Sequence, residues 1–434
     1  MGHLANTDQA VTEGATPPRV DRPKNLHRRR SGLVQIFPRD TAEAPITWEV
    51  AREGVVGRSS TCAWPIHDPK VSREHARLYP RDGGFTVQDL GSRNGTYVNG
   101  VPVASGGDAF LPFGAVLRLA NTLLLAAEDA QAHAGAPRVL PADKAGTRGD
   151  VVAGPALAAV WDHAARVARD AHPVLVVGEN GSGKEVLARL IHAAGYANKP
   201  LVARNVGAIP EGLFESELFG HARGSFTSAV QSRLGAFRSA HHGVLFLDEI
   251  ADLRLDHQVK LLRALDEGRV VPVGEDRPVD VDVRVVAATN KDLRELVLAG
   301  RFREDLYYRL ATVTIRVPPL RERRDEVLLL ALRMLAVETV NATFSADTAE
   351  ALALAPWPGN VRNLLRVVLE AARHAADDRR HVIEPSDLPE LVPLERVTVL
   401  ESGEMTVEKL RAAVLRASGV IRRAASDLGI SRST

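Results

Sequence analysis

Residues 173–192 read PVLVVGENGSGKEVLARLIH, an apolar run followed by a Gly-rich loop and an amphipathic stretch. The three loop glycines let backbone amides turn inward onto phosphate oxygens, and Lys184 then reaches the terminal phosphates. Glu185 stands where the common pattern has Ser or Thr. The order of strand, loop and helix predicts a phosphate-binding loop that comprises Gly178, Glu179, Asn180, Gly181, Ser182, Gly183, Lys184 and Glu185.

Polar residues end two further apolar runs, GVLFLDEI at 243–250 and VRVVAATN at 283–290. Continuous apolar runs of this kind predict parallel strands covered on both faces, with chemistry at their carboxyl ends. Asp248 is expected to hold magnesium, and Glu249 to polarise an attacking water. Asn290 either senses the terminal phosphate or positions that water, or it simply caps its strand.

Three arginines are candidates for the charge that develops in phosphoryl transfer. Arg303 and Arg309 lie in FREDLYYRL at 302–310, and Arg362 follows the turn Pro-Gly-Asn in WPGNVRNLL at 357–365. An arginine finger accelerates such hydrolysis by roughly 10³–10⁵. A solvated arginine, or one paired with an acid, is the alternative at each position.

The composition fits a multidomain globular protein. The chain has 434 residues, of which 45% are hydrophobic and 25% charged, with a formal net charge of +1. At about 150 residues per domain, this length predicts roughly three domains. The charge balance excludes a polybasic nucleic-acid-binding protein, so any nucleic-acid surface is a local patch. The single cysteine, Cys62, excludes a disulfide framework and a cysteine-based zinc site.

Changes of pattern divide the chain into segments. Short runs rich in β-branched and aromatic residues, separated by turn signals, predict a β-sandwich before a central α/β part, and helical patterns follow it. We expect a disordered tail at 1–31, the sandwich at 32–128, a linker at 129–150, the α/β domain at 151–320, a helical lid at 321–390, a linker at 391–405 and helices at 406–434. Neither a membrane-spanning stretch nor a secretory signal is recognisable, which favours a cytoplasmic protein.

Seven motifs, in order, resemble the AAA+ ATPase domain of sigma-54-dependent transcriptional activators, also called bacterial enhancer-binding proteins. They are GENGSGKE, SELFGHARGSFTSA, GVLFLDEI, VRVVAATN, FREDLYYRL, VPPLRERRDEV and WPGNVRNL, and they span about 151–390. Glu185 supports the resemblance, because Glu normally follows the phosphate-loop lysine in this family. The resemblance implies a hexameric ring that hydrolyses ATP with Mg²⁺ and acts on the sigma-54 RNA polymerase.

The resemblance also assigns roles to single residues. Lys184 corresponds to the phosphate contact, and Asp248 with Glu249 to the acidic Walker B pair. Asn205 resembles a switch residue that restrains the catalytic glutamate, and Arg362 resembles the sensor II arginine of the lid. Arg303 and Arg309 resemble fingers that reach the ATP of the neighbouring subunit.

A loop between 224 and 229 resembles the segment with which this family contacts the sigma factor. It consists of Gly224, Ser225, Phe226, Thr227, Ser228 and Ala229. The usual pattern is G-A-F-T-G-A, so Phe and Thr are kept while Ser replaces an Ala and a Gly. Ser228 adopts a positive φ less freely than Gly, so coupling to the sigma factor is expected to weaken if the loop needs that conformation.

The sandwich segment resembles the forkhead-associated (FHA) domain, which binds phosphothreonine peptides through loops at one end. The resemblance rests on VVGRSSTCAWPIHDPKVSREHARL at 55–78 and DLGSRNGTYVNG at 89–100. A phosphate dianion needs charge-assisted and hydroxyl donors on adjacent loops. Here the candidate donors are Arg58, Ser72, Arg73, Arg93 and Asn94.

Residues 406–434 resemble the Fis-type helix-turn-helix that ends these activators. Six Lys or Arg against two Asp or Glu between 407 and 434 suit DNA phosphates. The sequence stops within the first turn of the recognition helix, and a reading helix needs more residues in the major groove. We therefore expect a partial helix-turn-helix that binds enhancer DNA weakly or not at all.

Three hypotheses about function follow. The first is a phosphothreonine-responsive, ring-forming ATPase that remodels the sigma-54 RNA polymerase closed complex. The second is a phosphopeptide-binding adaptor whose AAA+ domain serves as an ATP-dependent assembly switch without transcriptional output, which the altered loop and the incomplete recognition helix favour somewhat. The third, an AAA+ remodeller of unrelated proteins, fits the ATPase motifs but not the loop at 224–229. No membrane partner is expected.

Overall fold

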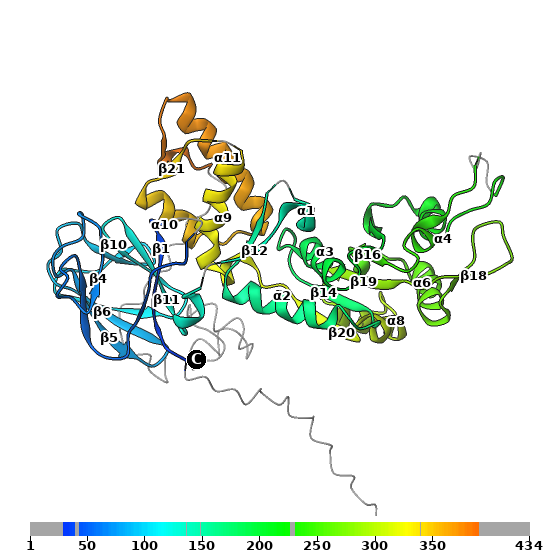
Figure 1. Ribbon diagram of the computed structural model, residues 1–434, viewed down its shortest axis with the longest axis horizontal. Helices are drawn as coiled ribbons and strands as arrows, with labels where there is room; N and C mark the ends of the chain where they lie inside the picture. Colours follow the sequence, from blue (N-terminus) through cyan, green and yellow to red (C-terminus); the bar gives the residue numbers. More distant parts are fainter. Residues whose placement is uncertain are drawn as a thin grey trace, which may run out of the picture.

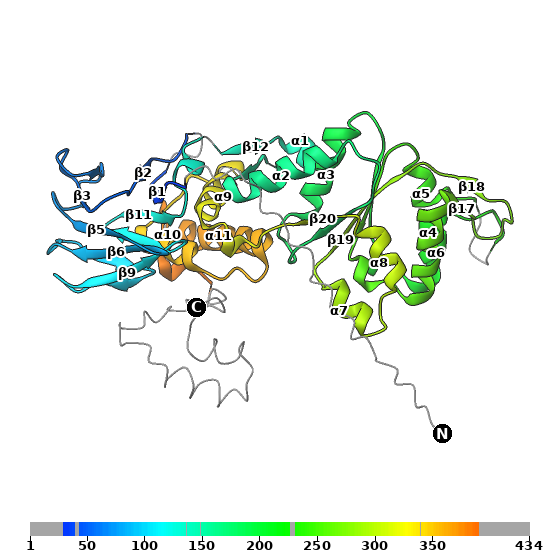
Figure 2. The ribbon, with the colours of Figure 1, turned by 90° about the horizontal axis from the view of Figure 1, so that it is seen from below.

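The computed structural model describes residues 29–39, 43–135, 137–147, 149–225, 231–338 and 340–389. They form a β-sandwich, a helical lid and an α/β domain, and the lid lies between the other two in both views (Figure 1, Figure 2). Most of the expected tail, and the predicted linker and helices at 391–434, lie outside the described residues.

Residues 32–127 fold as the predicted sandwich of two sheets. One sheet has the strand order β2-β1-β11-β10-β7-β8 and the other β4-β3-β5-β6-β9. The strands are β1 (Gly32–Phe37), β2 (Thr47–Glu49), β3 (Gly54–Gly57), β4 (Trp64–Pro65), β5 (Ala76–Arg81), β6 (Gly84–Asp89), β7 (Thr96–Val98), β8 (Val101–Pro102), β9 (Asp108–Pro112), β10 (Val116–Leu119) and β11 (Thr122–Ala127). Alternate side chains of both sheets fill the core between them, among them Leu78, Phe85 and Leu117.

The segment at 129–150, expected to be a linker, carries short elements of its own. They are η1 (Gln131–His133), β12 (Arg138–Leu140) and α1 (Ala142–Ala145). Strand β12 pairs antiparallel with β13 (Val151–Ala153), which opens the α/β domain. The segment therefore joins the sandwich to the α/β domain through backbone pairing.

A parallel sheet of order β15-β16-β19-β14-β20 forms the centre of the α/β domain. Its strands are β14 (Val174–Val177), β15 (Leu201–Asn205), β16 (Val244–Asp248), β19 (Arg284–Thr289) and β20 (Val313–Arg316). Both faces are covered, as their apolar runs predict: Val174 and Val176 point into one core and Leu175 into the other. This geometry gathers the carboxyl ends of β14 and β16 at one edge.

Helices flank the sheet on both sides (Figure 2). The core with Val174 contains α2 (Pro155–Val167) and α3 (Lys184–Gly195). The core with Leu175 contains residues of α4 (Phe214–Phe219), α5 (Gly235–Ser239), α6 (Leu255–Glu267), α7 (Leu293–Leu298) and α8 (Glu304–Leu310). Short segments complete the domain: η2 (Val206–Ala208), η3 (Glu211–Leu213), η4 (Ile250–Asp252) and the antiparallel pair β17 (Arg269–Val270) and β18 (Val279–Asp280).

The lid begins at η5 (Leu320–Glu322) and is mainly helical, as predicted. It contains α9 (Arg324–Val337), α10 (Ala346–Leu354), α11 (Asn360–Asp377), the parallel pair β21 (Thr343–Phe344) and β22 (Val382–Ile383), and η6 (Pro385–Asp387). Its hydrophobic core is continuous with apolar side chains of β1, β10 and β11 of the sandwich. The sandwich is thus packed against the lid rather than tethered at a distance.

Candidate functional site

The phosphate-binding loop lies between β14 and α3. Gly181 (φ +72°) and Gly183 (φ +107°) adopt left-handed conformations that favour glycine. A Cβ at position 181 would also lie 2.3 Å from the carbonyl oxygen of Gly359 in the lid. Lys184 begins α3 and is buried, and its Nζ donates to the carbonyl oxygens of Gly178 (3.0 Å) and Glu179 (3.2 Å). The loop therefore curls around the lysine ammonium.

The two acidic residues of GVLFLDEI stand at the end of β16. Asp248 is half-buried, and its Oδ1 accepts a hydrogen bond of 3.0 Å from the backbone N–H of Glu249. Burial raises the pKa of Asp248, and the nearby Lys184 ammonium opposes that rise. Glu249 has φ 58° and ψ 40°, a left-handed conformation that is uncommon outside glycine and often found at functional sites.

A cleft of about 650 Å³ lies between the α/β domain and the lid and brings most of the expected residues together. Its lining includes the loop from Asn180 to Glu185, Asn205, Asp248, Glu249 and Arg362. One part of the lining is apolar, formed by Leu157, Trp161, Leu330, Met334 and Val337. A polar end next to an apolar slot suits a ligand with a phosphate group and a flat ring.

Asn205 and Glu249 approach each other over Gly207. The Asn205 Oδ1 accepts from the Ala208 N–H at 3.2 Å. An added Cβ on Gly207 would lie 2.9 Å from Glu249 Oε2 and 3.5 Å from Asn205 Oδ1. The absence of a side chain at 207 therefore leaves room for the Glu249 carboxylate beside Asn205.

The lid holds the loop through residues that the sequence analysis did not single out. Asn360 is buried, and its Nδ2 donates to Glu179 Oε2 (3.1 Å) and to the Asn180 carbonyl (3.0 Å). Arg321 forms two hydrogen bonds to the Glu179 carboxylate at 2.6 and 2.8 Å, which lower the pKa of that carboxyl group. The Glu179 side chain joins the loop to the lid, and its expected contact with a nucleotide stays a prediction.

Arg323 is a second link of this kind, and nothing in the local sequence marks it. Its guanidinium is buried, donates to the Ser182 carbonyl at 3.2 Å and pairs with Glu326 at 2.7 Å. Glu326 in turn accepts from the Gly154 N–H at 2.8 Å. One buried ion pair thus connects the lid, the phosphate-binding loop and the start of α2.

Besides Gly178 and Glu179 at the start of the loop, three candidates do not line the cleft of their own chain. Asn290 is exposed and does not line the cavity. Arg303 pairs with Asp305 at 2.6 Å, and Arg309 pairs with Asp266 at 3.0 Å and donates to the Leu265 carbonyl at 2.7 Å. Both arginines are exposed at the surface of the α/β domain.

The loop expected to contact a sigma factor is described only at its start. Gly224 has φ +80°, and the Ser225 hydroxyl donates to the Ala222 carbonyl at 2.8 Å. Phe226, Thr227, Ser228 and Ala229 lie outside the described residues, so the expectation about Ser228 stays a prediction. His221 forms isolated bridges with Arg233 and Val273, which hold the base of this loop.

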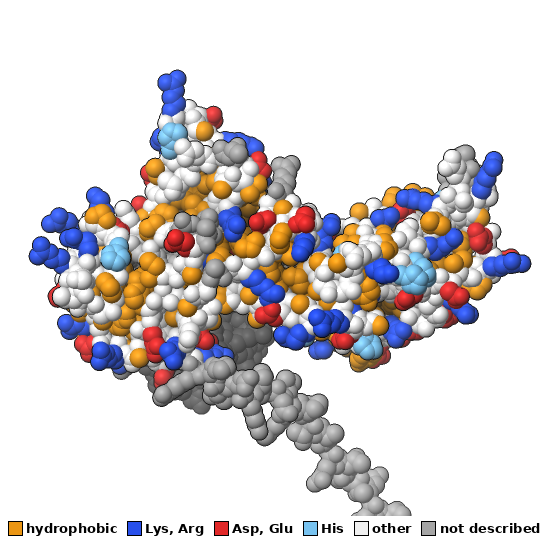
Figure 3. All heavy atoms as spheres, viewed as in Figure 1, with side chains coloured by type: hydrophobic (Ala, Val, Ile, Leu, Met, Phe, Trp, Pro, Cys, Tyr) orange, Lys and Arg blue, Asp and Glu red, His pale blue; other side chains and the backbone are white. Residues whose placement is uncertain are grey.

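The sandwich carries its candidate phosphate donors on three loops, which follow β3, β4 and β6. Arg58, Arg73, Arg93 and Asn94 are exposed around the partly buried Ser72. The Arg93 N–H donates to Ser72 Oγ at 3.1 Å, and Asn94 Nδ2 donates to the Lys70 carbonyl at 2.6 Å. Lys and Arg side chains project from the end of the module near β4, away from the lid (Figure 3).

The buried His75 ring contacts two of these loops. Its Nδ1 accepts from the Ser72 N–H at 3.1 Å, so its Nε2 carries the hydrogen that points to the Gly95 carbonyl at 3.1 Å. Burial lowers the pKa of His75, and the hydrogen bond to Gly95 opposes that shift. The neutral ring therefore joins these two loops.

Comparisons with known proteins agree with this architecture. The sigma-54 interaction domain family matches residues 151–316, the AAA+ ATPase lid domain family matches 321–398, and the FHA domain family matches 54–120. The transcriptional regulatory protein ZraR of Salmonella typhimurium is 40% identical over 307 residues, which cover 68% of this chain and 69% of ZraR.

This chain belongs to the family of sigma-54-dependent transcriptional regulators.

Two other similar proteins show how far the likeness extends. The response regulator PilR of Pseudomonas aeruginosa is 48% identical over 240 residues, 54% of this chain. This sigma-54-dependent regulator spans about half of the length of PilR (53%). The crystal structure of NtrX from Brucella abortus superposes with a TM-score of 0.52 and 31% identity, covering 64% of this chain and 65% of NtrX. NtrX is also known in complex with ADP and with ATP.

The comparisons leave two expectations about this regulator as predictions. Residues 406–434, the proposed partial helix-turn-helix, lie outside the described residues, and enhancer-DNA binding rests on sequence alone.

In the part of the chain that the structure describes, no helix is long and apolar enough to span a bilayer.

Proposed function

We propose that this regulator hydrolyses ATP in a ring and uses the energy to remodel the sigma-54 RNA polymerase closed complex, with input from phosphothreonine recognition by its sandwich. The observation that carries the proposal is the convergence of Lys184, Asp248, Glu249 and Arg362 on one cleft beneath the lid. The match to the sigma-54 interaction domain family supports the output.

The chemistry of the cleft is attack by water on the terminal phosphorus of ATP, which breaks the bond to the bridging oxygen and yields ADP and phosphate. Glu249 orients and polarises the water, and its left-handed backbone aims the carboxylate from the end of β16 into the cleft. Lys184 and Arg362 are the cations for the charge that develops on the phosphate oxygens.

Asp248 is the residue that fits Mg²⁺, which would neutralise phosphate charge during hydrolysis. Among the described residues no cluster of three or more His, Cys, Asp or Glu side chains could hold a metal ion. Mg²⁺ in nucleotide sites commonly takes one or two carboxylates, substrate phosphates and waters, so a single half-buried aspartate is a suitable protein ligand.

The proposed ring supplies further cations to each cleft from a neighbouring subunit. Arg303 and Arg309 are exposed, separate from their own cleft, and held by exposed acids that a neighbour can displace. A cation supplied in trans requires a head-to-tail contact between subunits, and such a contact closes into a ring where the rotation between neighbours closes. We therefore assign these arginines to the ATP site of the adjacent protomer in a hexamer.

The sandwich supplies the input through a phosphothreonine site. Three exposed arginines flank Ser72: the Arg58 N–H donates to its carbonyl, Arg73 follows it in the chain, and the Arg93 N–H donates to its Oγ. The Ser72 hydroxyl hydrogen can donate to a phosphate oxygen. Asn94 and His75 hold the loops after β4 and β6 at a fixed separation through Lys70 and Gly95. Fixed donors of this kind suit a dianionic phosphate.

Promoter melting by purified components tests the proposal. The full chain is combined with sigma-54 RNA polymerase and a promoter duplex, with ATP or a non-hydrolysable analogue, and strand opening is followed by permanganate reactivity. We expect opening with ATP only, and none with Lys184→Ala. ATP hydrolysis without opening would contradict the transcriptional output.

A further inference from the structure

The sandwich sheet that contains β1 and β11 is buried on both faces along these two strands. Antiparallel sheets usually keep one face in water, which gives an alternation of apolar and polar side chains. Strand β11 reads TLLLAA and is buried at every position. Leu124 and Ala126 point into the core of the sandwich, whereas Leu123 and Leu125 belong to the core that the sandwich shares with the lid. The lid therefore covers the face of this sheet that would otherwise be exposed to solvent.

A charged cluster borders this apolar contact. The Arg118 guanidinium of β10 lies 3.9 Å above the Tyr97 ring and pairs with Asp347 (2.9 Å) and Glu350 (2.8 Å) of α10. Glu350 is only 6% exposed and also accepts from the Gly100 N–H at 3.0 Å. The partly buried Arg118 and the buried Glu350, which carry opposite charges, fix the orientation of the sandwich on α10.

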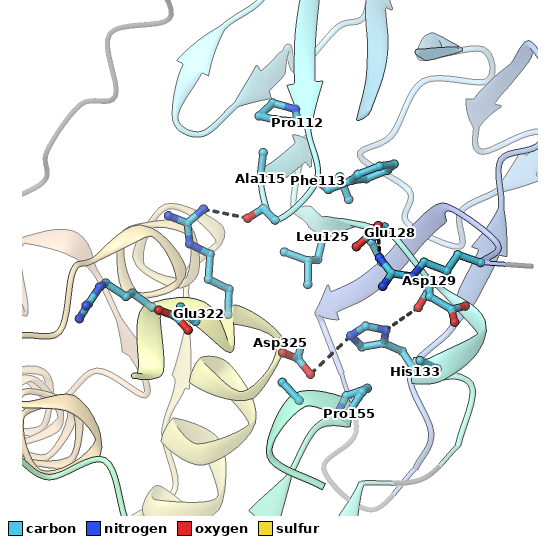
Figure 4. Close-up of a pocket in the computed structure, with 18 of the residues that line it drawn as sticks. Pro112, Phe113, Ala115, Leu125, Glu128, Asp129, His133, Pro155, Glu322 and Asp325 are labelled. Carbon is cyan, nitrogen blue, oxygen red and sulfur yellow. Dashed lines mark hydrogen bonds and ion pairs between the residues drawn. The ribbon is translucent and has the colours of Figure 1, made fainter. Parts of the chain in front are cut away.

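The linker side of the interface carries a second set of polar contacts. A cavity of about 590 Å³ lies there between sandwich, linker and lid. Figure 4 shows Leu125 and Phe113 on the sandwich side and Asp325 on the lid side, with His133 of the linker directed at Asp325. The His133 Nε2 lies 3.6 Å from Asp325, and Arg324 donates to the Gly114 carbonyl at 2.8 Å.

Helix α9 contacts the sandwich with one side and the proposed nucleotide cleft with the other. Leu328, Ala331 and Leu335 belong to the core shared with the sandwich, while Leu330 and Met334 line the cleft. The same lid forms hydrogen bonds to the phosphate-binding loop through Arg323 and Asn360. A movement of the sandwich would therefore also move α9, which forms one wall of the cleft.

Strand β7 connects the candidate phosphothreonine loops to the same lid. Arg93 and Asn94 immediately precede this strand, Tyr97 lies within it beneath Arg118, and Gly100 follows it and bonds to Glu350. Only two residues, Gly95 and Thr96, thus separate Asn94 from Tyr97 and the cation-π contact that faces α10. A peptide that orders these loops also orders the strand that docks on the lid.

We infer that the sandwich and the lid form one body whose Arg118–Glu350 contact links phosphothreonine binding to nucleotide binding, each ligand tightening the other. This inference rests on the proposed function for the identity of both ligands. An extensive apolar interdomain contact opposes independent domain motion, and linkage between two sites is reciprocal by thermodynamic necessity. A phosphopeptide that stabilises the docked sandwich therefore stabilises the lid position in which Arg323 and Asn360 hold the phosphate-binding loop.

Nucleotide affinity tests the linkage. The dissociation constant of a fluorescent ADP is measured on the full chain with and without a degenerate phosphothreonine peptide pool, and the unphosphorylated pool is the control. We expect the phosphorylated pool to tighten ADP binding about five-fold or more. In Arg118→Met the pool still binds, but the change in ADP affinity disappears. In the charge-swapped pair Arg118→Glu with Glu350→Arg part of it returns.

A distance measurement tests docking independently of both ligands. Spin labels are placed at the exposed Asp82 of the sandwich and Asp378 of the lid in a Cys62→Ser background. We expect one narrow distance distribution in the parent and a broadened one in Arg118→Glu. A broad distribution in the parent, or unchanged ADP affinity when both probes bind, overturns the inference. If the distance distribution is narrow but the fluorescent ADP or the phosphothreonine peptide pool does not bind, the result counts against the proposed function instead.

Discussion

The ammonium of Lys184 and the carboxylate of Asp248 interact across the cleft, and burial acts on both. Burial lowers the pKa of Lys184 and raises that of Asp248, while each charge opposes the shift of the other. Each charge therefore favours the ionised form of the other against the effect of burial. A site of this kind gains most from a ligand that brings phosphate to the lysine and a divalent cation to the aspartate.

Removing the ammonium should disable the cleft. Lys184→Ala is expected to lower ATP turnover by about 10² or more, because a preorganised cationic donor is lost. Lys199→Ala is the matched control, since Lys199 is exposed and outside the cleft. Steady-state phosphate release measures both variants. Equal turnover in Lys184→Ala and Lys199→Ala would refute the assignment of the cleft.

A methyl group at position 207 should displace the proposed catalytic carboxylate. In Gly207→Ala the new Cβ would lie 2.9 Å from Glu249 Oε2 and 3.2 Å from Asp252 Oδ2, so Glu249 must shift. We expect turnover to fall by about ten-fold or more, with nucleotide affinity unchanged, because misplaced catalytic groups lower rates steeply. Gly212→Ala, whose Cβ meets nothing within 4 Å, should behave as the parent. A loss of affinity instead of turnover would mean that Glu249 has a different role.

Phosphopeptide binding should depend on the arginines around Ser72. Arg58→Ala is expected to weaken binding of a phosphothreonine peptide pool by about ten-fold or more, since a hydrogen bond to a charged group contributes about 1.5–3 kcal/mol. Arg81→Ala removes an exposed arginine elsewhere in the sandwich and serves as the control. Calorimetric titration distinguishes the two. Full affinity in Arg58→Ala would indicate a module that does not recognise phosphate in this way.

Acid should destabilise the sandwich through His75. Because burial lowers its pKa, the folded state favours the neutral ring, and the unfolded state binds a proton first as pH falls below about 6.5. The contribution of this ring is complete above that pH and is lost as pH falls toward the lower folded value. Histidine hydrogen exchange read by mass spectrometry should give a His75 pKa below 6.5. A value at or above 6.5 would contradict the neutral, loop-joining ring.

The phosphate-binding loop and the parallel strands could be predicted from sequence because their signals are local. Gly181, Gly183 and Lys184 lie within one turn of chain, and each strand is an uninterrupted apolar run. The same locality explains the prediction of the sandwich from its turn residues. Features set by the backbone of a single segment are therefore accessible to sequence reasoning.

Contacts between distant segments were not accessible in that way. Glu179 contacts Arg321 and Asn360 across the cleft, and β12 forms because its partner β13 lies beyond the expected linker. The docked face of the sandwich had one sequence signal, the missing alternation in TLLLAA of β11. That signal shows that something covers the strand, but not that the lid does.

Mixing two inactive variants tests the central claim most directly, namely that each cleft is completed by arginines of an adjacent protomer. Lys184→Ala retains Arg303 and Arg309 but has a disabled ATP cleft. The double variant Arg303→Ala with Arg309→Ala has an intact ATP cleft but lacks both arginines. We predict that each alone is inactive and that their mixture hydrolyses ATP, because a head-to-tail contact pairs an intact site with intact fingers. A mixture that stays as inactive as its components, although it assembles, would contradict the account.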